Sequence, residues 1–410
     1  MTTRPLVQLI EYGPSEEVDC QPEQAVALLA TGLVDVRPTI RNECRTLVPG
    51  GKVGAVRVGD LEVHVSPKVE INRVLFLLEY APDRPSWHLP TVNVAKESDL
   101  LSAVATVFAH AANRATRSGL LQGYREREES LTVFRGRLRE GDQLRLQHGR
   151  PLPVEVRYDD FTVDITENQL LLSAVSTLLR LPMLPTTIRR SLTDLRHRFV
   201  DVTGLVRGIR VPQWKASRLN VRYHPALHLA DLILAGSSFE HRAGELSVSG
   251  LVLDMPKVFE DFLTKALTDA LREAGGQVVR QPPTWLDEEE AIRTYPDIVW
   301  LRDDRPRAVV DAKYKAEKND SFPNADLYQA LAYATVLDLP EAHLVYAQGH
   351  EAPREHTVRH SGIRITTHVL DLSLPPRALL EQVDRLALLL STRKRMALDQ
   401  HLPSDAGVAV

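Results

Sequence analysis

Two aspartates and a lysine lie close together in a segment that is predicted to form a β-hairpin. Asp297 begins one expected strand, and Asp311 and Lys313 lie in the next, after a turn near Asp304. Residues two apart on a strand share a face, so the side chains of Asp311 and Lys313 are expected to point the same way. With that turn, Asp297 falls opposite Asp311, and the two carboxylates can share a divalent cation. The spacing predicts metal-assisted hydrolysis of a phosphodiester.

Each of these residues has an expected role. Asp297 and Asp311, together with the carbonyl of Ala312, are expected to hold Mg²⁺, with Mn²⁺ as an alternative, and to leave positions for water and a phosphate oxygen. Lys313 is expected to position the attacking water or to stabilise charge that develops on the phosphate. The alternative is an exposed hairpin with an ordinary salt bridge, because Asp-x-Lys is a common sequence.

Residues outside the hairpin strengthen the metal-site hypothesis. Gln329 and Tyr333 lie four apart on an expected helix and therefore share a face. The order of the motifs resembles the RecB-like branch of the PD-(D/E)xK nucleases, namely Pro-Asp at Asp297, Asp-x-Lys at Asp311 to Lys313 and Gln-x-x-x-Tyr at Gln329 to Tyr333. Glu260, on the preceding helix, stands where that superfamily often has another acid, which would bind the metal or hydrogen-bond its water. Glu260 is equally well explained as an acid favoured near a helix N-terminus.

The elements that must position these residues alternate between helix and strand. The helix Lys257–Ala274 carries a long apolar stripe and ends at Gly275-Gly276. The elements predicted after it are strands at 277–281, 298–301 and 308–314, a helix at 326–337 and a strand at 343–348. This gives an α/β domain with an αβββαβ core like that of PD-(D/E)xK restriction endonucleases.

Four segments around these residues resemble the McrC family, the nuclease subunits of McrBC modification-dependent (5-methylcytosine) restriction systems. They are Asp254–Phe262, Tyr295–Ile298, Val310–Lys315 and Asp326–Ala334. Upstream segments are similar to the family in the same order, namely Val53–Val56, Ser66–Val69, Gly119–Tyr124, Arg135–Leu138 and Thr166–Asn168. The resemblance implies a subunit that cleaves modified foreign DNA when it is assembled with a GTP-hydrolysing AAA+ McrB-like ring.

The resemblance also implies that the N-terminal part of the chain engages the ring and stimulates its hydrolysis. The expected hairpin or meander at Arg45–Val69 is the candidate segment, with Arg45, Lys52 and Arg57 as partner-binding residues. Gly50-Gly51-Lys52 is not a phosphate loop, because Thr46 and Val53 stand where that motif needs a glycine and a Ser or Thr. We therefore expect no nucleotide site in this chain.

The composition limits the other classes of protein. The chain has 410 residues, 43% of them hydrophobic, and a formal net charge of −4, which are ordinary globular proportions. Two cysteines, Cys20 and Cys44, cannot form a four-thiolate zinc site or a cysteine-held iron-sulfur cluster. No apolar run approaches the length of a membrane span and no signal peptide is recognised, so a cytoplasmic protein without a membrane partner is expected.

Arginine is concentrated in the middle of the chain, between Ala111 and Arg222, where basic residues outnumber acidic ones. Such a stretch favours phosphate backbones, and Arg135 and Arg137 are the candidate DNA-binding residues, although a solvated basic face is as plausible. The predicted domains are a β-rich, partner-binding domain at 1–105, a basic α+β region at 106–247, the nuclease domain at 248–400 and a flexible tail at 401–410. Short strands are expected at Leu131–Phe134 and Val154–Tyr158.

Two other functions compete with this prediction. A stand-alone RecB-like DNA repair nuclease would share the catalytic residues, although such enzymes often carry a cysteine cluster that is missing here. A non-enzymatic adaptor that only activates an ATPase would not need the set of two acids and a lysine. For the restriction subunit, each chain supplies one active centre, so cutting both DNA strands requires dimerisation of complexes or successive nicking.

Overall fold

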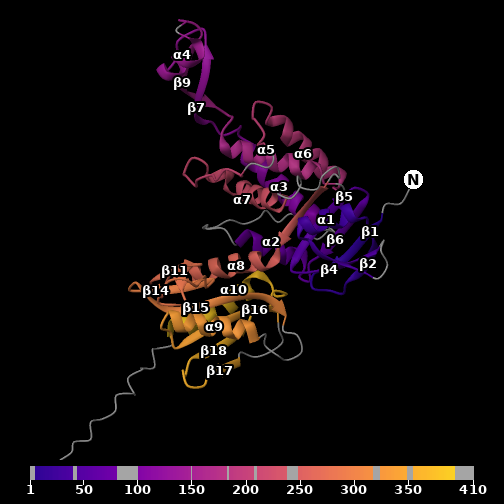
Figure 1. Cartoon of the computed structure of the whole chain (residues 1–410), viewed down its shortest axis with the longest axis vertical. Coiled ribbons are helices and arrows are strands. Elements are labelled where there is room, and N and C mark those ends of the chain that lie inside the picture. Colours follow the sequence, from indigo (N-terminus) through magenta and orange to yellow (C-terminus); the bar gives the residue numbers. More distant parts are fainter. Residues whose placement is uncertain are drawn as a thin grey trace, which may run out of the picture. The chain divides into compact units, whose positions relative to one another are not determined.

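The structure is a computed structural model that describes residues 5–39, 44–80, 100–148, 150–181, 184–206, 210–237, 248–316, 324–348 and 354–392. The predicted tail at 401–410 lies outside these residues. The chain divides into two compact units, one of Met1–Ile71 and Ser86–Leu253, the other of Asn72–Pro85 and Asp254–Val410. Both units combine helices with sheets, which confirms the predicted mixture of α and β structure (Figure 1).

The first unit begins with two small sheets packed around one apolar core. Its four-stranded sheet has the order β1-β6-β5-β10, and its three-stranded sheet the order β2-β4-β3. The strands are β1 (Leu6–Ile10), β2 (Glu16–Asp19), β3 (Val34–Pro38), β4 (Cys44–Pro49), β5 (Lys52–Val58), β6 (Leu61–Ser66) and β10 (Val248–Asp254). The helix α1 (Pro22–Thr31) contributes Ala27 and Leu28 to the core that both sheets share.

The hairpin expected over Arg45–Val69 is only partly formed. Strands β5 and β6 pair around the Gly59-Asp60 turn, as predicted. Strand β4 instead pairs with β2 and β3, so Pro49-Gly50-Gly51 carries the chain from one sheet into the other. Both β5 and β6 are inner strands of their sheet, because β10 and β1 flank them.

The rest of the first unit is a helical bundle with a β module that extends from it (Figure 1). Helices α3 (Leu100–Thr116), α5 (Thr166–Leu179), α6 (Thr186–Arg198) and α7 (His224–Gly236) pack on one another, and a short 3₁₀ helix spans Val221–Tyr223. The module contains β7 (Gly123–Leu131), β8 (Arg137–Leu138), β9 (Val154–Thr162) and α4 (Glu140–Gln147). The strand predicted at Leu131–Phe134 is wrong, because β7 ends at Leu131 and Val133 and Phe134 are exposed.

The second unit is built on a six-stranded sheet with the order β11-β14-β15-β16-β18-β17. The first three strands are antiparallel neighbours, whereas β15, β16 and β18 run parallel. The strands are β11 (Gln277–Arg280), β14 (Ile298–Arg302), β15 (Arg305–Ala316), β16 (Glu341–Gln348), β17 (Arg354–Thr357) and β18 (Arg364–Val369), with a separate pair β12 (Thr284–Trp285) and β13 (Arg293–Thr294).

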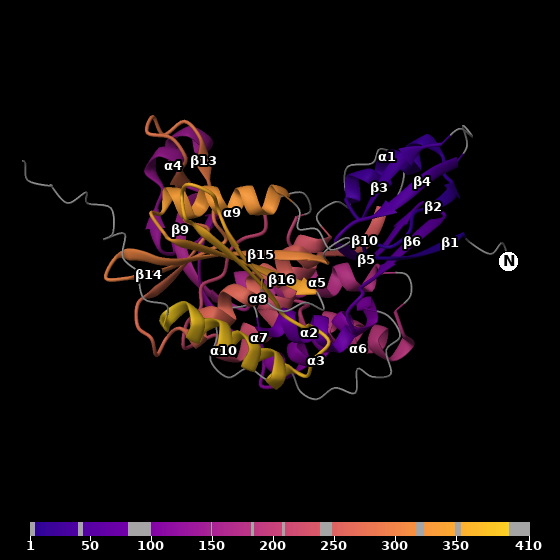
Figure 2. The same ribbon diagram turned by 90° about the horizontal axis from the view of Figure 1, so that it is seen from below.

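Helices cover both faces of this sheet (Figure 2). Helix α9 (Asn324–Val336) packs on one face through Ala330, Tyr333 and Ala334. The opposite face is covered by α8 (Met255–Ala270) and α10 (Pro376–Thr392), which also contact each other. Helix α2 (Ile71–Tyr80) joins α8 through aromatic contacts of Phe76 and Tyr80 with Phe262 at 5.9 and 5.5 Å between ring centroids.

The start of α8 shows how the sequence fixes the element that carries Glu260. The Asp254 side chain accepts a hydrogen bond from the backbone N–H of Lys257 at 3.1 Å, and Pro256 occupies the first turn, where its missing N–H costs nothing. Among the helices of the described residues, none combines the length and the apolar character that crossing a membrane requires.

Gly54 should be essential to the first unit. Its φ is +138°, and an added Cβ would lie 2.0 Å from the carbonyl oxygen of Leu251 on β10. We expect Gly54→Ala to lower the free energy of unfolding by about 2 to 4 kcal/mol. Gly50→Ala is the matched control, since a Cβ there meets no atom of the structure within 4 Å. Urea unfolding of both variants tests this, and equal effects would contradict the packing of β5 against β10.

Candidate active site

The hairpin of β14 and β15 places the two predicted acids opposite each other. In the strand register Ile298 pairs with Val310, so the preceding Asp297 lies beside Asp311. Asp303 and Asp304 both have positive φ, near +55°, as a tight two-residue hairpin turn requires. The Asp297 Oδ2 atom accepts a hydrogen bond of 2.8 Å from the backbone N–H of Ala312, which fixes the carboxylate against β15.

Burial and like charge make this pair of acids electrostatically unfavourable. Asp311 is 3% exposed and Asp297 is half-buried. Burial and the nearby Asp311 carboxylate raise the pKa of Asp297 to about 7, against the lowering effect of the Ala312 N–H. Burial also raises the pKa of Asp311, and the neighbouring Lys313 ammonium opposes that rise. Ionising both carboxyl groups together is therefore unfavourable in free energy unless a cation lies between them.

Lys313 connects the acid pair to helix α9. Its ammonium forms an ion pair with Asp311 and donates a hydrogen bond of 2.8 Å to Gln329 Oε1. Gln329 Nε2 donates to the Tyr333 hydroxyl at 2.8 Å, and that hydroxyl donates to the backbone carbonyl of Tyr295 at 3.0 Å. The chain of contacts therefore starts at Asp311 and returns to the segment two residues before Asp297. Burial and the Asp311 carboxylate raise the pKa of Tyr333 to about 12.

Glu260 lies near this site but is held by other groups. It raises the pKa of Asp297, so its charge reaches the acid pair. Its Oε1 accepts hydrogen bonds from Gln281 at 2.9 Å and from Lys257 at 3.1 Å, and it forms an ion pair with Arg280 at 3.3 Å. Within the part of the chain that the structure describes, no group of three or more His, Cys, Asp or Glu side chains converges as a ready metal site. Asp297 and Asp311 are a pair of carboxylates that face each other.

Sequence reasoning did not single out Tyr295 and Asp326 as members of this cluster. Tyr295 acts through its backbone carbonyl, which leaves no trace in the residue type. Asp326 is buried in the first turn of α9, with an oxygen 3.9 Å from Lys313 Nζ. Its position three residues before Gln329 places it on the same helical face, so the i, i+3 spacing was an available signal.

The predicted partner-binding residues lie in the first unit. Arg57 on β5 is paired with Glu62 on β6 at 2.9 Å, and Glu62 also contacts His64 at 2.7 Å. Arg45 on β4 donates to the carbonyl of Cys44 at 2.8 Å. Lys52 begins β5, with its ammonium near Gly32. The structure does not group the three side chains into one cluster, and their role stays a prediction.

The predicted DNA-binding arginines lie in the β7–β9 module. Arg135 stacks on the Tyr158 ring, with its guanidinium carbon 4.1 Å from the ring centroid, and faces Asp160 at 3.5 Å. Arg137 is exposed on β8, opposite Arg157 on β9. Both arginines line one pocket of about 760 Å³ whose rim also carries Glu126, Glu140 and Asp142. Their contact with DNA stays a prediction.

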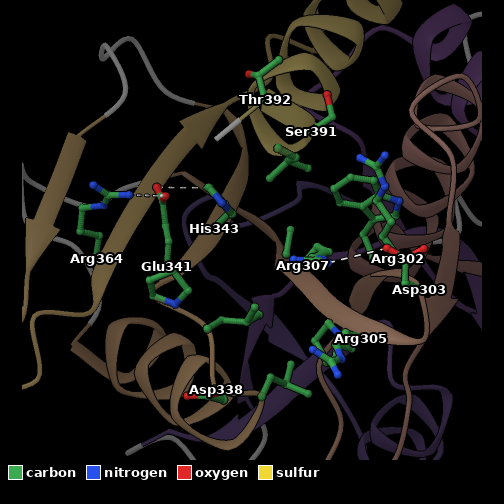
Figure 3. Close-up of a pocket in the computed structure, with 17 residues that line it drawn as sticks. Arg302, Asp303, Arg305, Arg307, Asp338, Glu341, His343, Arg364, Ser391 and Thr392 are labelled. Carbon is green, nitrogen blue, oxygen red and sulfur yellow. Dashed lines mark hydrogen bonds and ion pairs between the residues drawn. The ribbon is translucent and has the colours of Figure 1, made fainter. Parts of the chain in front are cut away.

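The second unit has a pocket of about 690 Å³ at the β14–β15 turn, the opposite end of the hairpin from the acids. Figure 3 shows the residues that line it. Arg302, Arg305 and Arg307 line it at the β14–β15 turn, and Arg364 on β18 lies across from them. Its charges are largely balanced, because Arg364 pairs with the buried Glu341 at 3.1 Å and Arg307 faces Asp303 at 3.8 Å. The C-terminal ends of α9 and α10 add partial negative charge to its wall. The pocket contains none of the predicted site residues.

A family model described as "McrBC 5-methylcytosine restriction system component" matches residues 48–347, which is most of the chain and includes both aspartates, Lys313, Gln329 and Tyr333. This chain belongs to the McrBC 5-methylcytosine restriction system component family. The resemblance to McrC that the sequence motifs carried is thereby confirmed. A comparison of this chain with curated proteins found no match.

Two solved structures are similar to this McrBC-family chain. One is the refined half-complex from a tetradecameric assembly of Thermococcus gammatolerans McrB AAA+ hexamers with bound McrC. A chain of that structure is 18% identical to this chain, and the alignment covers 94% of this chain and 99% of that chain, with a TM-score of 0.60. The other is the cryo-EM structure of the Thermococcus gammatolerans McrBC complex, with 19% identity, 65% and 88% covered, and a TM-score of 0.41. The first likeness establishes a shared fold.

The raised pKa of Asp297 predicts a stability that depends on pH. Between about pH 4, where an unfolded aspartate ionises, and pH 7, the folded state retains a proton that the unfolded state has lost. The free energy of unfolding should therefore fall as the pH rises through this window. Asp297→Asn removes that loss and can still accept the Ala312 N–H, so at pH 8 without divalent cations it should be more stable than the parent by on the order of 1 to 3 kcal/mol.

The difference between Asp297→Asn and the parent should shrink as the pH falls to 4 and below, because the carboxyl group then becomes protonated in the unfolded state as well as in the folded state. Urea unfolding at pH 4, 6 and 8 in EDTA measures it. Asp303→Asn, on the exposed turn of the same hairpin, is the control and should show no such trend. A stability gain of Asp297→Asn that is the same at every pH would contradict the electrostatic explanation.

Proposed function

We propose that this chain is the nuclease subunit of a McrBC-type restriction complex, an Mg²⁺-dependent endonuclease acting on modified double-stranded DNA. The observation that carries the proposal is the pair Asp297 and Asp311, which face each other across the hairpin beside Lys313. Membership of the McrBC restriction family supports the role in DNA restriction. The six-stranded sheet with α9 on one face and α8 on the other supports the assignment to the PD-(D/E)xK superfamily.

The donor set fits a magnesium ion. Mg²⁺ is usually held by one or two carboxylates and keeps its other positions for water and phosphate oxygens, so the two aspartates suffice as side-chain ligands. A divalent cation would also offset the burial that raises the pKa of both groups and the Asp311 charge that raises the pKa of Asp297 further. Glu260 would join through a water or after release from Lys257 and Arg280. Mn²⁺ accepts the same oxygen ligands and is expected to substitute.

The side chains around the acids divide the work of hydrolysis. When bound, Mg²⁺ supplies Lewis-acid polarisation of the phosphodiester and stabilises the charge that grows on its oxygens. Lys313 holds a positive charge beside the reacting phosphate and orients the attacking water. Gln329 fixes the Lys313 ammonium by the 2.8 Å hydrogen bond, and Tyr333 fixes Gln329. Tyr333 also anchors the segment before Asp297, so the α9 pair keeps both halves of the site in register.

The proposed partner is a GTP-hydrolysing AAA+ McrB-like ring, whose hydrolysis this chain would stimulate. The sequence has no phosphate-loop motif, which fits a complex in which the ring, and not this chain, hydrolyses GTP. The similar Thermococcus gammatolerans assembly combines McrB AAA+ hexamers with McrC. Arg45, Lys52 and Arg57 remain the proposed partner-binding residues, although the pairing of Arg57 with Glu62 would have to be given up for a partner. Arg135 and Arg137 remain the proposed DNA contacts.

Asp311→Asn tests the nuclease proposal directly. With the genomic AAA+ partner, GTP and Mg²⁺, the parent should cut methylated plasmid, and Asp311→Asn should lower the cutting rate by about 10³-fold or more because one metal ligand is lost. GTP hydrolysis by the ring should stay at the parental level. The cut DNA is measured on gels and the released phosphate in a coupled assay.

The control for that experiment is Asp303→Asn, the same substitution at the opposite end of the hairpin, which should cut like the parent. Parental cutting by Asp311→Asn would refute the assigned site. Cutting by the purified chain without partner or GTP would instead favour a stand-alone RecB-like nuclease. Failure of the parent to cut in any mixture, with stimulation of GTP hydrolysis retained, would favour the non-enzymatic adaptor.

A further inference from the structure

A buried aspartate outside the predicted motif lies beside the proposed catalytic lysine. Asp326 is 4% exposed in the first turn of α9, and its Oδ1 atom lies 3.9 Å from Lys313 Nζ. Its other oxygen, Oδ2, accepts a hydrogen bond of 3.3 Å from the hydroxyl of Tyr346 on β16. Asp326 therefore stands between the parallel neighbour of β15 and the ammonium of Lys313.

The surroundings of Lys313 show why a second acid matters there. The side chain of Lys313 is only 14% exposed, and a charged ammonium in such a place needs partners that offset its lost hydration. Its partners are Asp311 on its own strand, Gln329 on α9 and, slightly farther away, Asp326 on the same helix. Two of these three belong to α9, so the helix can hold the ammonium without help from β15.

We propose that Asp326 is a positioning residue that holds the Lys313 ammonium on the α9 side when Asp311 is engaged by the metal. This inference rests on the proposed function, in which the Asp311 carboxylate binds the divalent cation. The ion pair between Lys313 and Asp311 then weakens, because the metal competes for the same carboxylate. Asp326 and Gln329 are left to fix the ammonium, and together they set where the positive charge meets the phosphate.

A purely structural role for Asp326 makes different predictions. An acid in the first turn of a helix is favoured by the helix dipole, and the Tyr346 hydroxyl would satisfy a buried oxygen in any case. Such a role would affect folding equally with and without a divalent cation. A positioning role affects the lysine chiefly when the cation is present.

The kinetic test uses Asp326→Asn in the full mixture with the AAA+ partner, GTP, Mg²⁺ and methylated plasmid. We expect kcat to fall about 10- to 100-fold, with KM for DNA and half-saturation by Mg²⁺ changed less than about twofold. Asp326→Glu keeps the charge and should recover most of the loss. The control is Asp338→Asn, in the exposed turn that follows the C-terminal end of α9, which should act like the parent. Parental kcat in Asp326→Asn would overturn the proposal, as would loss in both Asn and Glu variants with unchanged unfolding midpoints.

The second test does not require cleavage. Lys313 in the full chain is labelled with an amine-reactive acylating reagent and quantified by mass spectrometry, with and without Ca²⁺ as a cation that seldom supports such cleavage. Asp326→Asn should raise Lys313 labelling about tenfold over the parent in Ca²⁺ and less than about twofold in EDTA, where Asp311 still holds the ammonium. An equal increase in both conditions would assign Asp326 a structural role and overturn the proposal. If Ca²⁺ changes Lys313 labelling neither in the parent nor in Asp326→Asn, the result would refute the proposed metal site at Asp297 and Asp311.

Discussion

The repulsion between the buried carboxylate of Asp311 and the half-buried carboxylate of Asp297 is the constraint on which the candidate site of the second unit depends. The register of β14 and β15 brings Asp297 beside Asp311, and burial together with the Asp311 charge raises the pKa of Asp297 to about 7. A fold selected for stability alone would place an apolar pair at these adjoining positions. The surrounding elements compensate in a defined way, through the Ala312 N–H on Asp297 and the Lys313 ammonium on Asp311.

Helix α9 connects this electrostatic centre to the rest of the sheet. Its packing side buries Ala330, the Tyr333 ring and Ala334 against β14, β15 and β16. Gln329 meets the Lys313 ammonium, and the Tyr333 hydroxyl reaches the Tyr295 carbonyl. Small residues on the packing side allow the helix to lie close to the sheet, so short polar contacts can form. Packing and site geometry are therefore set by the same helix.

Much of this site followed from residue spacing alone. The tight turn at Asp303-Asp304 and the period of two along a strand place Asp297, Asp311 and Lys313 on one face, and the period of the helix aligns Gln329 with Tyr333. These are local relations, which a sequence can state. The helix predicted at Lys257–Ala274, which corresponds to α8, was likewise visible from its apolar stripe.

Relations between distant segments could not be read in this way. Strand β10 pairs with β5, and α2 packs on α8 in the second unit, although many residues separate these partners. The role of Asp326 depends on Tyr346 and Lys313 from two other elements. The segment Arg45–Val69 alternated like a simple meander, but Pro49-Gly50-Gly51 leads β4 and β5 into different sheets. Tertiary pairing decided each of these cases.

The most direct measurement of the central claim is calorimetric titration of the full chain with Mg²⁺ at pH 6 and pH 8.5, in buffers that differ in ionisation enthalpy. If the acid pair is the metal site, binding at pH 6 releases close to one proton, because the cation displaces the proton that the raised pKa retains. At pH 8.5 the release should vanish, and Asp297→Asn should abolish the release seen at pH 6. Binding that releases no proton at pH 6, or that is unchanged in Asp297→Asn, would contradict the claim that Asp297 and Asp311 hold the metal.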